Sequence, residues 1–255
     1  DVELTSYDPV PVGTTIRAPG KLVLAGEYAV VDGGCSIVLA INRGVECEVT
    51  SDSGISTPNG DTRFVNHALD LLPYGLTFKD WNPVVNLHGQ KPGFGGSAAA
   101  CVIATFLSGR NILDAVEIHH KIQGSGSGID VLASIYGGIF HWDPIQKIRT
   151  PVREITPIVV WTGNSARTGE RVEAYLQYDN REHFIEQSNH FTELFMREPI
   201  QATSSLYTNL KMISRDAGFQ YTTAAIEEIV QLAQQNNGAA KPSGAGGGDC
   251  VVAFF

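Results

Sequence analysis

Alternating apolar and polar residues predict strands in the first part of the chain. Val45, Cys47 and Val49 alternate with polar residues across 44–50, and two shorter candidate strands cover 15–17 and 21–25. Successive side chains of a strand point to opposite faces, so this pattern is typical of strands with one buried face. The run 83–87, which precedes a glycine-rich segment, is predicted to be a further strand.

Helical spacing of apolar residues predicts a mixed α/β chain. Residues 97–107 are apolar almost all round, as expected for a buried helix, whereas 112–122 has one apolar face and 129–134 opens a third helix after a glycine-serine turn. Further on, 158–161 reads as a strand, and 251–255 as a closing strand. Three more helices are predicted at 182–195, 203–217 and 223–235.

The run from Lys91 to Ala100, KPGFGGSAAA, has the chemistry of a phosphate cradle. Glycines let the backbone approach a polyphosphate, and the free N–H groups at the start of the next helix point at the anion. Ser97 would stand at that helix start, able to ligate Mg²⁺ or a phosphate oxygen. The spacing fits neither the P-loop nor the dinucleotide fingerprint. By itself the run is equally well read as a tight connection before a helix.

Two other segments give this loop a family context. APGKLVLAGEYAV spans Ala18 to Val30, and KPSGAGGGDC spans Lys241 to Cys250. With the glycine-rich run they resemble, in order, the three signature motifs of the GHMP kinase superfamily, over almost the whole chain. The resemblance implies an α+β fold with a ribosomal-protein-S5-like N-terminal lobe, residues 1–154, and a ferredoxin-like C-terminal lobe, residues 155–255. Nucleotide and substrate would bind in the cleft between them.

Within the superfamily the motifs are similar to those of phosphomevalonate kinases. Tyr28 stands where mevalonate kinases usually carry histidine, and Asp249 where they more often carry glycine. The stretches 124–138 and 161–168 also resemble that family, as a catalytic-aspartate segment and a substrate-side loop. The resemblance implies an enzyme that uses ATP and Mg²⁺ to phosphorylate 5-phosphomevalonate to 5-diphosphomevalonate, in the mevalonate route to isoprenoids.

The same resemblance implies roles for individual residues. Lys21 would be catalytic by bridging the acceptor and the γ-phosphate. Asp130 would orient the acceptor or Lys21, or act as a base; its alternative role as a helix cap can coexist with these. The residues expected to bind the ATP phosphates are Lys91, Gly93, Phe94, Gly95, Gly96, Ser97 and Ala98. The residues expected on the substrate side are Lys21, Ser165, Arg167, Thr168, Gly246, Gly247 and Asp249. Ser97 and Glu27 are the candidates for metal binding, although Glu27 has the alternative role of tying down the loop of the first motif.

Composition narrows the partners. The chain of 255 residues has a formal net charge of −9, which argues against a nucleic-acid binder. Only 18 residues are Lys or Arg. Those in or beside motifs, Lys21, Lys91, Arg167 and Lys241, are therefore candidate anion ligands, against the alternative of solvated surface charges.

Other features predict a cytoplasmic protein and suggest neither a disulfide framework nor a zinc site. The four cysteines form no Cys-x-x-Cys pair and are expected to be mostly buried thiols. No run of about 18 apolar residues is present, so no membrane partner is expected. His119 and His120 are expected to be structural. The protein is predicted to act as a monomer or a homodimer on a small-molecule substrate.

Three alternatives to phosphomevalonate kinase remain open at this stage. A mevalonate kinase, or another sugar or alcohol kinase of the superfamily, would use Asp130 as a true base on a hydroxyl group. A non-catalytic nucleotide or metabolite sensor is disfavoured because Lys21, Ser97 and Asp130 are all present. A diphosphomevalonate decarboxylase is disfavoured by the intact Pro-Gly-Lys of the first motif.

Overall fold

The computed structural model describes residues 10–71, 75–166 and 168–255. The chain forms two compact units whose segments interleave along the sequence. Unit 1 comprises Asp1–Lys21, Ala40–Pro83 and Phe94–Gly137, and unit 2 comprises Leu22–Leu39, Val84–Gly93 and Gly138–Phe255. The lobe boundary expected between residues 154 and 155 stays a prediction.

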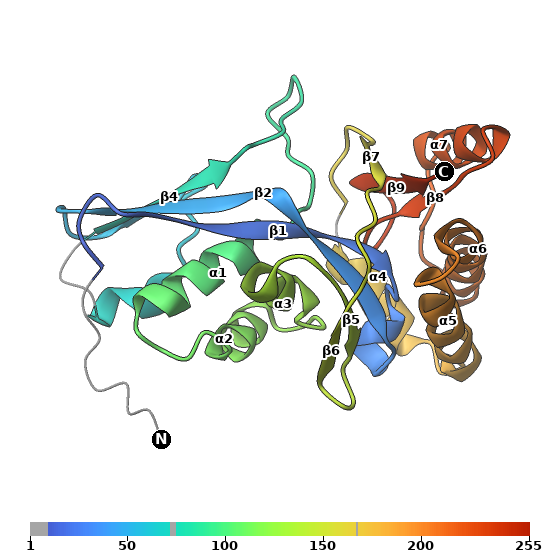
Figure 1. Cartoon of the computed structure of the whole chain (residues 1–255), viewed down its shortest axis with the longest axis horizontal. Coiled ribbons are helices and arrows are strands. Elements are labelled where there is room, and N and C mark those ends of the chain that lie inside the picture. Colours follow the sequence, from blue (N-terminus) through green and yellow to red (C-terminus); the bar gives the residue numbers. More distant parts are fainter. Residues whose placement is uncertain (1–9, 72–74, 167) are drawn as a thin grey trace. The chain divides into compact units, whose positions relative to one another are not determined.

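Unit 1 is a sheet covered by three helices. Strands β1 (Thr15–Ala25) and β2 (Ser36–Thr50) contribute to both units and pair with each other. In unit 1, β2 pairs antiparallel with β4 (Gly75–Trp81), and β3 (Ile55–Ser56) pairs parallel with β4. Helices α1 (Gly96–Leu107), α2 (Asp114–Gln123) and α3 (Ile129–Tyr136) lie together on one side of these strands (Figure 1). A 3-10 helix covers Asn66–Leu71.

The core of unit 1 follows the predicted alternation. Val45, Cys47 and Val49 are buried in one cluster with Ile103 and Leu107 of α1. A second cluster joins the opposite side of α1 to α2 and α3 through Cys101, Ala115 and Val131. Because α1 packs on both sides, its sequence is apolar almost all round, and the prediction of a buried helix there is confirmed.

Unit 2 contains a second sheet and four helices. Strand β5 (Ile139–Asp143) pairs antiparallel with Ser36–Leu39 of β2 and with β6 (Ile148–Pro151). Strands β7 (Ile158–Trp161), β8 (Ala239–Pro242) and β9 (Cys250–Phe254) form a sheet in the order β7-β9-β8. The helices are α4 (Thr168–Gln177), α5 (Glu182–Phe195), α6 (Pro199–Ala217) and α7 (Ala224–Gln235), with a 3-10 helix at Ala29–Asp32.

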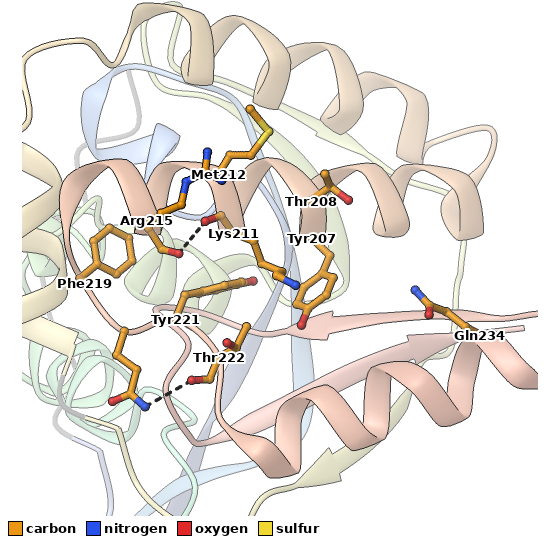
Figure 2. A pocket seen from close by; sticks show the side chains of 11 residues that line it. Tyr207, Thr208, Lys211, Met212, Arg215, Phe219, Tyr221, Thr222 and Gln234 are labelled. Carbon is orange, nitrogen blue, oxygen red and sulfur yellow. Dashed lines mark hydrogen bonds between the residues drawn. The ribbon is translucent and has the colours of Figure 1, made fainter.

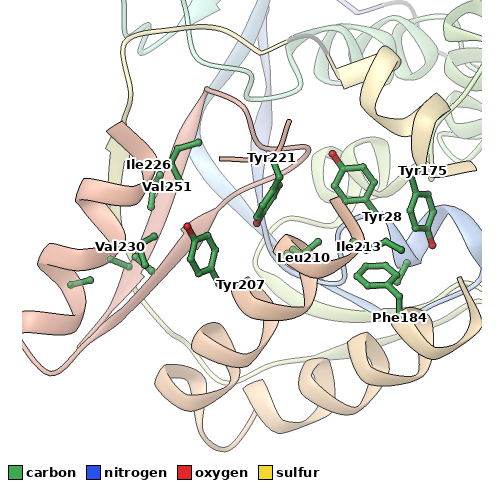
Figure 3. Packing of buried hydrophobic residues seen from close by; sticks show 14 residues of the cluster. Tyr28, Tyr175, Phe184, Tyr207, Leu210, Ile213, Tyr221, Ile226, Val230 and Val251 are labelled. Atoms are coloured by element: carbon green, nitrogen blue, oxygen red, sulfur yellow. The ribbon is translucent and has the colours of Figure 1, made fainter. Parts of the chain in front are cut away.

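Aromatic side chains dominate the core of unit 2. Tyr28 lies 5.3 Å from Tyr175 and 4.9 Å from Phe219 between ring centroids. Figure 3 shows this cluster continuing through Tyr207 and Tyr221 toward α7. Tyr28, which the sequence singled out within the first motif, is therefore a core residue, and burial raises the pKa of its hydroxyl.

Most predicted elements are confirmed to within a few residues, including the strand at 158–161 and the helix at 182–195. The strand predicted at 83–87 is wrong. The Asn86 side chain accepts hydrogen bonds from the backbone N–H groups of His88 and Gln90, so the chain turns there instead of extending. The strand ahead of the glycine-rich run is β4, which ends at Trp81. Within the described ranges, no helix combines the length and apolar character that a membrane span needs.

Candidate functional site

Lys21 and Asp130 both lie against the glycine that precedes α1, Gly95. A Cβ atom placed on Gly95 would be 3.5 Å from Lys21 Cε and 3.5 Å from Asp130 Cβ, all within unit 1. Gly95 has φ 76°, in the left-handed region that favours glycine. The two residues predicted to be catalytic thus come together at the glycine-rich run 91–100, which is called the phosphate loop after its predicted role. Both are partly exposed, and Lys21 has no ion-pair partner among the described residues.

The backbone of the first motif is fixed directly to the phosphate loop. The Lys21 N–H donates to the Phe94 carbonyl at 2.9 Å, and a Cβ on Gly20 would collide with that same oxygen. From α3, the Ser134 hydroxyl donates to the Pro19 carbonyl at 2.6 Å. The Pro-Gly-Lys sequence is therefore explained locally, because only glycine before Lys21 permits this close approach. These contacts set where the Lys21 side chain begins.

Asp130 is the second residue of α3. Gly128 is the N-cap, so Asp130 is not the N-cap itself, but its carboxylate accepts the Val131 N–H at 3.1 Å. A negative charge in the first turn of a helix is stabilised by the helix dipole. Asp130 therefore does bind a backbone N–H group of the helix through Oδ1, as the alternative role of a helix cap requires. Its other carboxylate oxygen, Oδ2, is left for a partner outside the helix.

The first turn of α1 supplies backbone N–H groups. Gly96 and Ser97 are its first two residues, and no side chain caps this end of the helix in the described structure. The first amides of a helix have no intrahelical acceptor, so this end favours an anion. Ala98, predicted to bind phosphate, has a fully buried side chain in the core of unit 1, so only its backbone N–H remains for that role.

Ser97 has a partner that the sequence did not reveal. Its hydroxyl lies 3.1 Å from Nε2 of His119, whose ring is buried and stacks on Phe64. Burial lowers the pKa of His119, while the Asp130 carboxylate acts in the opposite direction. His119 was expected to be structural, but it also holds the hydroxyl that was predicted to bind metal or phosphate. No spacing signal links residues 97 and 119, because α1 and α2 meet only in the fold.

The beginning of the phosphate loop belongs to unit 2, where Asp249 holds it. The Asp249 carboxylate accepts the Gly93 N–H at 3.1 Å, and the Ser165 hydroxyl donates to the Lys91 carbonyl at 2.9 Å. Asp249 itself has φ 54°, a strained conformation for a residue with a side chain. The predicted substrate-side residues Asp249 and Ser165 are therefore brought together with Lys91 and Gly93.

The glycine-rich loop of the third motif is packed against two residues. The Gly247 N–H donates to the Tyr221 carbonyl at 2.7 Å, and a Cβ on Gly246 would collide with the Tyr221 ring. Arg171 of α4 lies against Gly247 and donates through Nε to the Gln220 carbonyl at 2.7 Å. Sequence reasoning missed Arg171, since it did not predict α4. Thr168 is exposed at the start of α4, and Arg167 lies outside the described residues.

Glu27 and Lys241 form a buried ion pair in unit 2. Lys241 Nζ donates to Glu27 Oε1 and also to the Pro242 carbonyl at 3.0 Å. Both side chains are almost fully buried, at 0% and 2% exposure for Lys241 and Glu27. Burial lowers the pKa of Lys241, and the Glu27 carboxylate opposes that shift. This geometry corrects the interpretation of Lys241 as an anion ligand. It also favours the tethering role of Glu27 over the metal-binding one.

The donor set of unit 1 suits a polyphosphate. The start of α1, which no side chain caps, Gly95 and the Lys21 ammonium, which has no ion-pair partner among the described residues, occur together there. No group of three His, Cys, Asp or Glu residues suited to a metal ion occurs in the described part of the chain.

Comparison with known proteins supports the motif reading. Residues 203–255 match the family model described as GHMP kinases C terminal. The chain is 26% identical to the phosphomevalonate kinase of Saccharolobus solfataricus over 94% of this chain and 89% of that protein. It is also 25% identical to the mevalonate kinase of Archaeoglobus fulgidus over 93% of this chain and 91% of that protein.

The fold comparison agrees. Streptococcus pneumoniae phosphomevalonate kinase, solved in complex with phosphomevalonate and AMPPNP, superposes with a TM-score of 0.77 at 18% identity, covering 94% of this chain and 91% of that one. The resemblance predicted from the three motifs is confirmed: the chain has the α+β fold of GHMP kinases, its residues 203–255 match the family model of their C-terminal region, and it is similar over most of its length to phosphomevalonate kinases.

Proposed function

We propose that the protein is a phosphomevalonate kinase, which transfers the γ-phosphoryl group of ATP to the phosphate of 5-phosphomevalonate. The observation that carries the proposal is that Lys21 and Asp130 both lie against Gly95, at a start of α1 that no side chain caps. The names of the similar proteins supply the acceptor. Cytoplasmic location and a monomeric or homodimeric state stay predictions.

The residues of unit 1 fit the needs of phosphoryl transfer. Two anions must approach each other, and the negative charge is spread over the transferred oxygens, so alignment and charge neutralisation are the main tasks. The Lys21 ammonium supplies a mobile positive charge beside the loop. The Gly96, Ser97 and Ala98 N–H groups supply fixed donors for phosphate oxygens. Bound Mg²⁺ would add charge neutralisation between the phosphates.

Asp130 has a different task with a phosphate acceptor than with an alcohol. A phosphate monoester has its second pKa near about 6, so it is already a dianion at neutral pH and needs no base. Asp130 Cβ and Lys21 Cε each lie 3.5 Å from the Cβ position of Gly95, so the Asp130 carboxylate is suited to orient the Lys21 ammonium group. A hydroxyl acceptor, as in a mevalonate kinase, would instead need Asp130 to accept a proton.

The test is ADP release from Mg-ATP with mevalonate, 5-phosphomevalonate or galactose as acceptor. We expect selective turnover of 5-phosphomevalonate and a fall in kcat of about 10²- to 10³-fold in Lys21→Met, the size seen when one charge-stabilising group is removed. Lys121→Met, which removes an exposed cation of unit 1, is the matched control and should keep full activity.

The other outcomes are equally informative. Mevalonate kinases are among the similar proteins, so turnover of mevalonate alone, with a large loss in Asp130→Asn, would replace the proposal by that activity. ATP binding without turnover of any acceptor would favour the sensor alternative.

A further inference from the structure

A pocket of about 600 Å³ opens in unit 2 beside α6, and none of its lining residues is among those predicted to be catalytic. It is lined by α6, the connection that follows it, and Gln234 of α7 (Figure 2). This volume falls within the range of pockets that take small organic ligands. The motifs assign no role to this pocket.

The pocket is positively charged and walled by rings. Lys211 and Arg215 stand one turn apart on α6, and none of the described residues that line the pocket is acidic. In a chain with a net charge of −9, two cations without a lining acid are unusual. The rings of Tyr207, Phe219 and Tyr221 form its apolar walls.

The two cations are only weakly engaged. Lys211 Nζ lies 5.3 Å from the centroid of the Tyr207 ring, a cation–π contact. Arg215 Nε donates to Asp216 at 3.2 Å, but both groups are solvent-exposed, and exposed pairs contribute about 0–1 kcal/mol. At the rim, Glu227 accepts the Thr222 hydroxyl at 3.2 Å. Both cations therefore remain available to an incoming anion.

Tyr221 provides an unused buried donor. Its side chain is almost fully buried, and its hydroxyl has no hydrogen-bond partner in the described structure. The ring centroid lies 6.1 Å from that of Tyr207, and the hydroxyl end is directed to the Tyr207 side of the pocket in Figures 2 and 3. A buried hydroxyl without a partner costs about 1–3 kcal/mol, so a ligand that accepts from it would recover that energy.

The pocket walls also touch the motifs. The Tyr221 ring packs on Gly246 and its carbonyl accepts the Gly247 N–H, while Phe219 stacks on Tyr28 at 4.9 Å. We propose that this pocket is a second ligand site, for a small phosphate monoester with a flat ring, and that its occupancy is transmitted to the glycine-rich loop through Tyr221. This inference goes beyond the proposed kinase activity and does not depend on it.

The two methionines of the chain make the test site-specific. Met212 lines the pocket and Met196 does not. The full chain, labelled with ¹³C at the methionine methyl groups and with ¹⁵N, is titrated with phenyl phosphate and followed by NMR. We expect a saturable shift of the Met212 methyl signal with Met196 unchanged, accompanied by shifts of the Gly246 and Gly247 amides. No turnover is needed, so failure of the kinase proposal leaves this result intact.

Variants decide the chemistry. Lys211→Gln combined with Arg215→Gln should weaken phenyl phosphate binding at least tenfold, and Lys121→Gln, an exposed cation of unit 1, should not. Tyr221→Phe should weaken binding about fivefold or more while leaving thermal stability unchanged or raised, because an unpaired hydroxyl is removed.

Three results would overturn the inference. These are a Met212 signal that does not move at millimolar phenyl phosphate, binding of benzyl alcohol as tight as that of phenyl phosphate, and unchanged affinity in the double variant. Saturation at Met212 without any shift of the two glycine amides would overturn the transmission through Tyr221.

Discussion

Replacing Lys241 by methionine should destabilise the protein strongly, although Lys241 is not among the residues predicted to be catalytic. The substitution removes the only cation paired with Glu27 in the described structure, and Glu27 Oε2 already lacks a partner. Breaking one partner of a buried ion pair typically costs about 3–5 kcal/mol, since the remaining charge is left unpaired in a low-dielectric interior. For a chain of this length that corresponds to a fall in Tm of roughly 6 to 20 °C.

The magnitude is tested by a double-mutant cycle. Glu27→Met, Lys241→Met and the double variant are unfolded in urea at pH 7 and followed by circular dichroism. The double variant should recover most of the loss, because two apolar side chains of similar size can replace a buried pair at little cost. Lys121→Met removes one partner of an ion pair in which both side chains are 72% exposed, so it should change stability by less than about 0.5 kcal/mol. Additive losses in the two single variants, or a Lys241→Met protein as stable as the wild type, would refute the reasoning.

Three further predictions follow from local geometry. Gly95→Ala should cost about 1–3 kcal/mol in stability because φ is 76°, as measured by thermal unfolding; the added Cβ would lie 3.5 Å from Lys21 Cε, an ordinary contact distance, so kcat should fall less than in Lys21→Met. Asp249→Ala should destabilise more than Asp249→Gly by about 1 kcal/mol, since both lose the bond to Gly93 but glycine adopts φ 54° without strain; equal melting temperatures would contradict this. Burial, aided by Arg110, lowers the pKa of His67 in the folded state. The contribution of neutral His67 to stability is therefore complete above about pH 6.5 and is lost as pH falls toward the lower folded-state pKa. His67→Gln should make the free energy of unfolding fall less between pH 7 and 5, and the exposed control His120→Gln should not.

The structure explains why His67 resists protonation. Thr105 donates its hydroxyl proton to the Cys101 carbonyl at 2.8 Å, so its oxygen accepts from His67 Nε2 at 3.0 Å. The other ring nitrogen, Nδ1, is buried and has no partner among the described residues. A second proton on the ring would have to be placed there without a hydrogen bond, which favours the neutral form.

Local patterns predicted the described α-helices other than α4, and they identified the three motifs. The apolar run of α1 and the alternation of Val45, Cys47 and Val49 reflect burial that is determined within one element and its immediate cover. The strand at 83–87 was wrong because one side chain, Asn86, competes for the backbone N–H groups that a strand would need. Such competition depends on side-chain geometry more than on hydrophobic pattern.

The site was predictable only as far as its motifs. Lys21, Gly95 and Asp130 were identified from the sequence, and the structure places them together. His119 and Arg171 were not, because each acquires its role from a neighbour on another element. Lys241 was misread for the same reason: nothing in its own motif shows that a carboxylate 214 positions earlier will be buried against it.

That separation has a consequence for how the chain is made. Residues 22–39 belong to the same compact unit as the segment from Gly138 onward, and Glu27 cannot be neutralised until Lys241 has been synthesised. During translation the side chains of Glu27 and Tyr28, which are buried in the folded protein, therefore stay exposed to solvent until the last segment of unit 2 is made. Unit 1, by contrast, has all of its segments available once Gly137 has emerged. Contacts so distant in sequence form slowly. Unit 2 is accordingly the part of the protein that we expect to complete its core last.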